Sequence, residues 1–182
     1  MVARARHGLR GSAAVERTAL TGPRAGRETG RSSATVLQGG RRKAYRPLPA
    51  TARAAAFRAG LAAYERGDFF LAHELLEPAW MGTDDLLERE LYQGLIKLAA
   101  GFVHVARGRP AGAVKNLRGA RDRLGRAAEA PGSDGGRDPD VGVDLDLPAL
   151  VAAIDEVLAS LEAGTPVERI VAPPVARRSS GR

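Results

Sequence analysis

Apolar residues between positions 47 and 172 recur mostly three and four places apart, with polar residues between them. This spacing puts the apolar side chains on one face of an α-helix and predicts a stripe that packs into a core. Segments with this pattern are residues 52–66, 69–80, 86–107, 110–128 and 147–163. The pattern therefore predicts an all-α fold, a compact single-domain bundle of about five helices.

Residues at the ends of these segments favour the same boundaries. Asp68 and Asp85 directly precede the second and third segments, where an aspartate side chain can accept hydrogen bonds from the first turn of a helix. Gly67 and Gly164 directly follow the first and fifth, where glycine favours a left-handed C-terminal cap. Pro78 removes a backbone donor late in the second segment and predicts a kink or an early end there.

Two glycines of the third segment, Gly94 and Gly101, are seven positions apart and share one helical face. Glycine inside a helix costs about 1 kcal/mol relative to alanine. This cost indicates that the backbone of another helix approaches closely along that face.

The charge is distributed unevenly along the chain. Residues 1–46 contain 11 Lys and Arg against 2 Asp and Glu, residues 47–172 contain 14 against 19, and residues 173–182 contain 3 against none. The two basic ends lack a persistent apolar pattern and are predicted to be a disordered basic arm and a disordered tail. The predicted helical domain at 47–172 is mildly acidic, which argues against a specific nucleic-acid partner.

Other classes of protein are disfavoured by what the sequence lacks. With no cysteine, the chain has neither disulfides nor thiolate metal ligands. No apolar run reaches the 18 residues of a membrane span, and the basic arm has no apolar run of the secretory type. We therefore expect a cytoplasmic protein without a membrane span.

Candidate chemistry is concentrated in the second and third segments. His73, Glu77 and Trp80 share one helical face, and Glu74 lies at its edge. Gln93 and His104 lie along one face of the next helix, together with Lys97 and Ala100. A short break makes the two helices antiparallel neighbours, so these faces can meet. The predicted cluster consists of His73, Glu74, Glu77, Trp80, Gln93 and His104.

Three hypotheses describe this cluster. It is a buried polar network that fixes the helix register, or a site for a small molecule or protein partner with Trp80 as an apolar wall, or a metal or acid/base site. The metal ligands would be His73, Glu77 and His104. The motif H-E-x-x-E differs from the H-E-x-x-H of zinc proteases, and the two E-x-x-H pairs of di-iron bundles are missing. No particular cofactor is indicated.

Three blocks of sequence resemble a known family. They are A-H-E-L-L-E-P-A-W at 72–80, Y-Q-G-L-I-K-L-A-A at 92–100 and H-V-A-R-G-R-P-A-G-A at 104–113. Together they are similar to the domain-of-unknown-function family numbered 309, over roughly residues 52–126. The resemblance implies a compact helical bundle and no assigned activity. Pro78 departs from the glutamate expected in many members.

These observations predict a helical protein with a structural role or one in binding a ligand or partner. The alternative is a metal-dependent, hydrolase-like enzyme that uses His73, Glu77 and His104, so the question of catalysis stays open. The partner would be a small molecule or another protein, and a homo-oligomer is compatible with the sequence.

Overall fold

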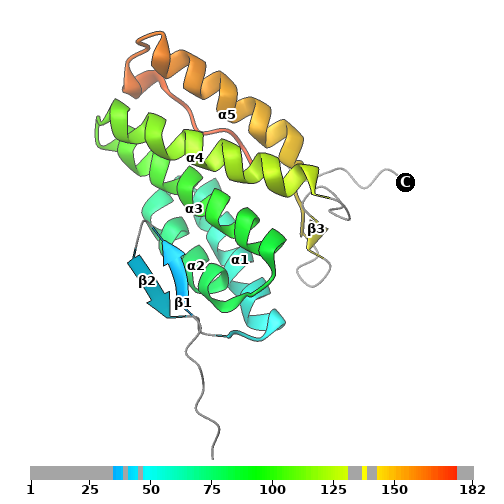
Figure 1. The fold of residues 1–182 in the computed structure, drawn as a ribbon. Coiled ribbons are helices and arrows are strands. Elements are labelled where there is room, and N and C mark those ends of the chain that lie inside the picture. Colours follow the sequence, from blue (N-terminus) through cyan, green and yellow to red (C-terminus); the bar gives the residue numbers. More distant parts are fainter. Residues whose placement is uncertain (1–34, 39–40, 45–46, 131–136, 139–142, 176–182) are drawn as a thin grey trace, which may run out of the picture. The chain divides into compact units, whose positions relative to one another are not determined.

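The computed structural model describes residues 35–38, 41–44, 47–130, 137–138 and 143–175, with side chains described for 47–130 and 145–175. Five α-helices account for most of these residues (Figure 1), which confirms the predicted all-α fold. They are α1 (Ala50–Glu65), α2 (Phe69–Gly82), α3 (Leu86–Ala106), α4 (Pro110–Glu129) and α5 (Leu147–Glu162).

Each helix packs against the next one in the chain, from α1 to α5. The helix α3 lies between α2 and α4 (Figure 1) and supplies more buried residues than any other described helix. Lys97, Ala100 and His104 form a half-buried strip along one face of α3. None of the described helices combines the length and the apolar character needed to cross a membrane.

The predicted caps are confirmed. Asp68 Oδ1 accepts a hydrogen bond from the Leu71 amide at 3.1 Å, and Asp85 Oδ1 accepts two at 2.8 Å from the first turn of α3. Gly67 and Gly164 follow α1 and α5 with φ values of 79° and 82°, in the left-handed region that glycine adopts without strain.

Of the kink or early end predicted for α2 at Pro78, the early end is wrong, because the helix continues to Gly82. Ala79 and Trp80 are fully buried just after the proline. Their burial holds the last turn against the core, and this outweighs the backbone hydrogen bond that proline cannot make.

Two short antiparallel strand pairs were not predicted. β1 (Thr35–Gln38) pairs with β2 (Arg41–Ala44), and β3 (Arg137–Asp138) pairs with β4 (Val143–Asp144). The Gly-Gly sequence between β1 and β2 is typical of a hairpin turn, although the flanking residues show no persistent strand period. The rest of the basic arm, for which disorder was predicted, lies outside the described residues.

The segment after α5 packs against the helices. It contains the 3-10 helix η1 (Val167–Arg169) and extends to Val175, which is 6% exposed. The Tyr64 hydroxyl donates a hydrogen bond of 3.2 Å to the carbonyl of Pro173. Residues 173–175, which were predicted as part of the disordered tail, therefore pack against the helices, because Val175 still has core surface to bury. Residues 176–182 lie outside the described part of the chain.

The close helix approach predicted from Gly94 and Gly101 is confirmed, and the neighbour is α4. A Cβ atom at position 94 would lie 2.7 Å from Cγ of Leu124, and one at position 101 would lie 2.8 Å from Cγ of Leu117. Both leucines are fully buried, so neither can move aside without opening the core.

Gly94→Ala should therefore lower the free energy of unfolding by about 1–2 kcal/mol, because overpacking outweighs the better helix propensity of alanine. Urea denaturation of the purified variant measures this. Gly125→Ala is the matched control, since Gly125 is also helical but a Cβ there meets nothing within 4 Å. The control should be more stable by about 0.5–1 kcal/mol. Equal stabilisation in both variants would contradict the close approach.

Burial raises the pKa of Tyr64 above its usual value. A raised phenol pKa means that the folded state holds this proton more tightly than the unfolded chain. The contribution to stability is thus complete below about pH 10 and is lost as the pH rises further.

Tyr64→Phe should lower the free energy of unfolding by about 1 kcal/mol at neutral pH, because the Pro173 carbonyl loses its donor. The difference between the two proteins should shrink above pH 10, where only the wild type loses stability from this group. Urea denaturation at pH 7 and at pH 10.5 checks both. A difference that stays constant over this range would contradict the role of the buried hydroxyl.

Candidate functional site

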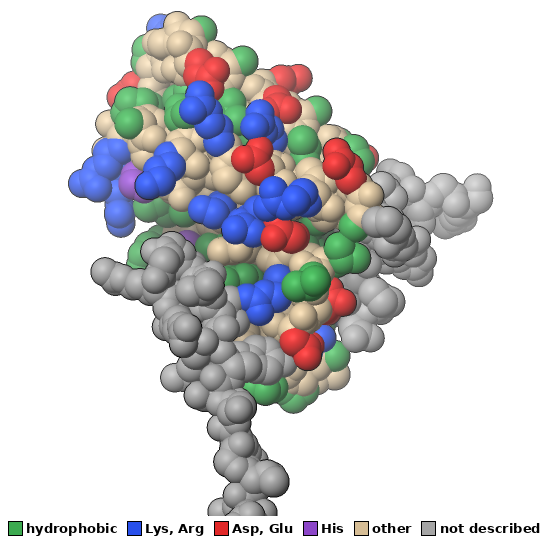
Figure 2. Space-filling view, viewed as in Figure 1, with side chains coloured by type: hydrophobic (Ala, Val, Ile, Leu, Met, Phe, Trp, Pro, Cys, Tyr) green, Lys and Arg blue, Asp and Glu red, His purple; other side chains and the backbone are tan. Residues whose placement is uncertain are grey.

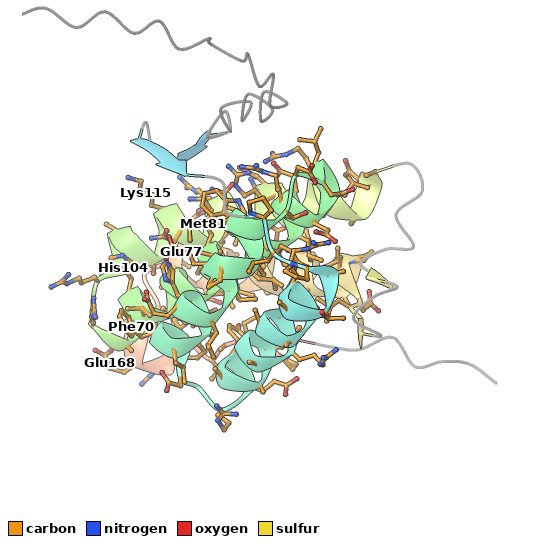
Figure 3. All side chains as sticks on the ribbon, turned by 90° about the horizontal axis from the view of Figure 1, so that it is seen from below. Phe70, Glu77, Met81, His104, Lys115 and Glu168 are labelled. Atoms are coloured by element: carbon orange, nitrogen blue, oxygen red, sulfur yellow. The ribbon has the colours of Figure 1, made fainter. Side chains whose placement is uncertain are left out.

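His73 and His104 line one cavity between α2 and α3. Its volume is about 140 Å³, and its lining consists of Phe70, His73, Ala100, Val103, His104 and Arg107. Figure 3 shows Phe70, Glu77 and His104 along the same edge of the helices. The structure therefore brings together the histidine-bearing faces of the two helices, as helical spacing predicts.

His73 is oriented by its neighbour Glu74. The imidazole Nδ1 lies 3.1 Å from Oε1 of Glu74, and the two side chains are 29% and 51% exposed. A pair this exposed adds little stability. Its effect is to fix the ring, since a histidine whose Nδ1 is occupied by a carboxylate leaves Nε2 for another contact.

His104 is oriented by packing instead. Its ring lies against Gly112 at the start of α4, where a Cβ atom would come within 2.7 Å of the ring atoms Cγ and Cε1. The ring's Nδ1 is buried, without a hydrogen-bond partner in the described part of the chain. As with His73, Nε2 is the nitrogen that remains for a ligand.

Arg107 adds a guanidinium, which donates only, to the two imidazoles of the cavity. It is the C-cap residue of α3 and is exposed. The lining contains two imidazoles, one guanidinium and no carboxylate, and its remaining residues are apolar. Such a cavity suits a ligand with hydrogen-bond acceptors and a negative charge.

A second group of polar atoms lies on α2 alone. His73, Glu74 and Glu77 each offer one ligand atom, and these atoms lie within 4.8 Å of one another. The predicted metal ligands were His73, Glu77 and His104. In the structure, Glu74 lies with His73 and Glu77, and His104 is not part of this group. One imidazole and two carboxylates could hold a divalent cation.

Trp80 and Gln93 lie apart from the cavity. They are 1% and 9% exposed, and no described cavity is lined by either. The guanidinium of Arg89 lies 5.7 Å from the centre of the Trp80 ring. This burial counts against Trp80 as the wall of a ligand pocket and places it in the core.

Three residues that line the cavity and one that shapes it were not predicted. Phe70, Val103 and Arg107 line the cavity beside the predicted Ala100, and Gly112 holds the His104 ring in place. Positions three away from the two histidines would have found Phe70 and Arg107. Gly112 carried no such signal, because its partner is on another helix.

Comparison with known families gives a match over the middle of the chain. The model of the family described as Domain of unknown function (DUF309) matches residues 57–116. This confirms the resemblance inferred from the sequence, over a shorter range than predicted, and the range includes the six predicted cluster residues together with Arg107 and Gly112. Neither curated proteins nor solved structures yield a match to the chain.

Proposed function

We propose that the chain is a ligand-binding protein, that its site is the cavity of His73 and His104, and that its ligand carries a small anionic group. The observation that carries this proposal is the convergence of His73, His104 and Arg107 on one cavity. The Arg107 guanidinium fork and an Nε2–H of His104 are donors that match a carboxylate or a phosphate. His73 adds a third donor when its ring carries both protons, because its Nδ1–H already donates to Glu74.

The size of the cavity supports a small ligand. A volume of about 140 Å³ is below the roughly 300–1,000 Å³ of pockets that take drug-sized molecules. The site thus fits a short molecule or one end of a longer one. Phe70 is 59% exposed at the cavity, which offers an apolar surface to the rest of the ligand.

The alternative of a purely structural polar network explains fewer observations. Polar groups in such a network are buried and bonded to one another. Trp80 and Gln93 are buried, but His73 and Glu74 are partly open to solvent. A histidine held by an exposed glutamate beside a cavity is better explained by a ligand than by the core.

Arg107→Ala should weaken the binding of a small carboxylate or of inorganic phosphate by about tenfold or more, because a hydrogen bond to a charged group is worth about 1.5–3 kcal/mol. Isothermal titration with acetate, propionate and phosphate at constant ionic strength measures the change. His104→Ala should weaken the same ligands.

Arg66→Ala is the matched control, because Arg66 is also an exposed arginine at the C-cap of a helix, here α1, and it lines no described cavity. It should bind like the wild type. If both variants lose the same affinity, the loss comes from the overall charge of the protein and not from the cavity. If the wild-type protein binds none of these ligands, the proposal is wrong.

A metal-dependent enzyme is the second candidate, favoured by the grouping of His73, Glu74 and Glu77. A cation bound by these three would keep an open position for water, as in catalytic zinc sites. The activity would then be a metal-assisted hydrolysis, with the anionic part of the substrate in the neighbouring cavity.

Titration with zinc or manganese separates the two candidates. The metal-enzyme candidate predicts stoichiometric binding that is lost in Glu77→Gln and kept in Glu129→Gln, a control at an exposed glutamate at the end of α4. Under the anion-binding proposal, Glu77→Gln keeps carboxylate binding or strengthens it, because a nearby negative charge is removed. Metal binding that survives both changes would exclude this set of ligands.

A further inference from the structure

The helix α3 has a second cationic position near the cavity. Lys97 lies three residues before Ala100 and seven before His104, on the same helical face. The side chain leans toward α4, where a Cβ atom at Gly119 would lie 3.0 Å from its Cδ and 3.3 Å from its Nζ. A glycine at 119 therefore leaves room for the lysine between the two helices.

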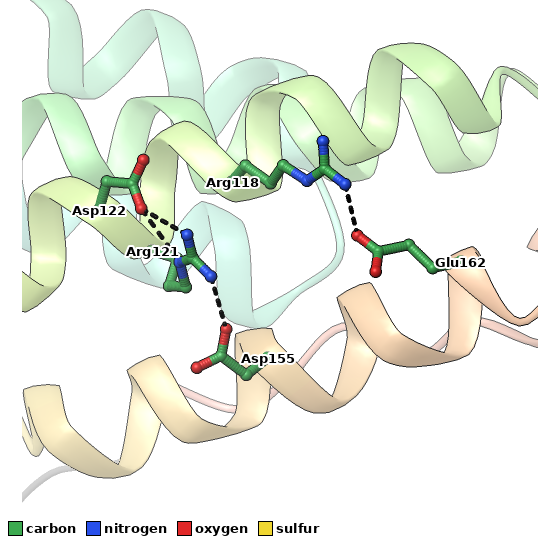
Figure 4. A network of polar contacts seen from close by, with 5 residues as sticks. All are labelled: Arg118, Arg121, Asp122, Asp155 and Glu162. Atoms are coloured by element: carbon green, nitrogen blue, oxygen red, sulfur yellow. Dashed lines mark hydrogen bonds and ion pairs between the residues drawn. The ribbon is translucent and has the colours of Figure 1, made fainter.

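The arginines of α4 are already paired with acids. Arg118 pairs with Glu162 and Arg121 with Asp122 and Asp155 (Figure 4). Arg123 and Arg126 both pair with Glu90 on α3. Figure 2 shows the resulting mixture of basic and acidic side chains over α4.

Lys97 and Lys115 differ from these arginines. Neither has an acidic partner in the part of the chain whose side chains are described. Burial lowers the pKa of Lys97, and the charges of Arg123 and Lys115 lower it further. Arg123 is itself paired with Glu90, so the repulsion left in place is the one between Lys97 and Lys115. An anion bound between these two lysines would relieve it.

Packing explains the methylene stem of Lys97 but not its charge. A long side chain can cover a glycine with its stem while the ammonium reaches water. Methionine would fill the same space without bringing a third positive charge beside Lys115 and Arg123. Packing accounts for the stem, and the ammonium is the group that remains to bind an anion.

The distance between Lys97 and His104 determines how long a ligand must be to reach both positions. Seven residues of α-helix span roughly 10 Å, which is the separation along α3 between Lys97 and His104. Ala100, between them on this face, lines the cavity. In Figure 3 the labelled Lys115 lies along the same edge as His104.

We propose that Lys97 and Lys115 bind a second anionic group of the same ligand, which is a small molecule with two anionic groups roughly 10 Å apart. This inference rests on the proposed function, since the first group occupies the cavity of His73, His104 and Arg107. Carboxylate and phosphoryl groups both fit these donors, and the probes below distinguish them.

Linear dicarboxylates provide the test. Isothermal titration uses a series of them, from shorter to longer than roughly 10 Å between the two carboxylates, beside a monocarboxylate and a bisphosphonate of matched length. The dissociation constant should reach a minimum near the matching length, at least about tenfold below that of the monocarboxylate, because the second contact is intramolecular. A tighter bisphosphonate would identify phosphoryl groups as the ligand chemistry.

Lys97→Met should abolish the length dependence, leave monocarboxylate binding unchanged and keep or raise the melting temperature, since a half-buried charge is removed. Arg118→Met is the matched control: it removes one exposed positive charge from α4 and should keep the length dependence. If Arg118→Met loses the length dependence as well, the effect comes from the overall charge of the protein, and the proposal is overturned.

The failure of this inference can be told from that of the proposed function. If every dicarboxylate binds like the monocarboxylate and Lys97→Met changes nothing, the second position is overturned and the cavity still stands. If neither monocarboxylates nor dicarboxylates bind the wild-type protein, both proposals fall.

Discussion

The close contact between α3 and α4 is the constraint on which the other features depend. Each helix contributes two glycines, seven residues apart, to this contact. Gly94 and Gly101 of α3 leave room for buried leucines of α4, and Gly112 and Gly119 of α4 leave room for side chains of α3. A Cβ atom at Gly94 or Gly101 would lie 2.7 Å from a buried leucine, so the two backbones can be this close only with glycine at these positions. At Gly119 a Cβ atom would lie 3.0 Å from the stem of Lys97, which is flexible and can shift.

The two pairs of glycines serve different kinds of side chain. Those of α3 accommodate apolar residues and build the core. Those of α4 accommodate the ring of His104 and the stem of Lys97, which are the polar residues of the half-buried strip of α3. The packing that stabilises the fold therefore also positions the groups that we propose for the ligand. A change at Gly112 would therefore disturb the candidate site by altering the contact between α3 and α4, and not by removing a contact with a ligand.

Much of this arrangement was predictable from local rules. Helical spacing predicted the five helices, and the capping aspartates predicted where two of them start. The low helix propensity of Gly94 and Gly101 predicted that another helix lies close to α3. The same spacing put His73 and His104 on facing sides of consecutive helices. It could not separate Trp80 from His73, since both lie on one face of α2, and only the tertiary neighbours decide which end of that face is buried.

What the sequence could not supply was the partner of each charged residue. The formal charge of residues 47–172 is −5 (14 Lys and Arg against 19 Asp and Glu), and this sum argues against an anionic ligand. The structure changes the argument, because Glu90, Asp155 and Glu162 are engaged by arginines of α4. Acids that are already paired contribute little net field to their surroundings, and Lys97 and Lys115 have no acidic partner in the part of the chain whose side chains are described. A domain that is acidic in total can thus offer a basic position on α3, while Glu74 and Glu77 lie on the α2 side of the cavity. This local balance decides which ligands are attracted.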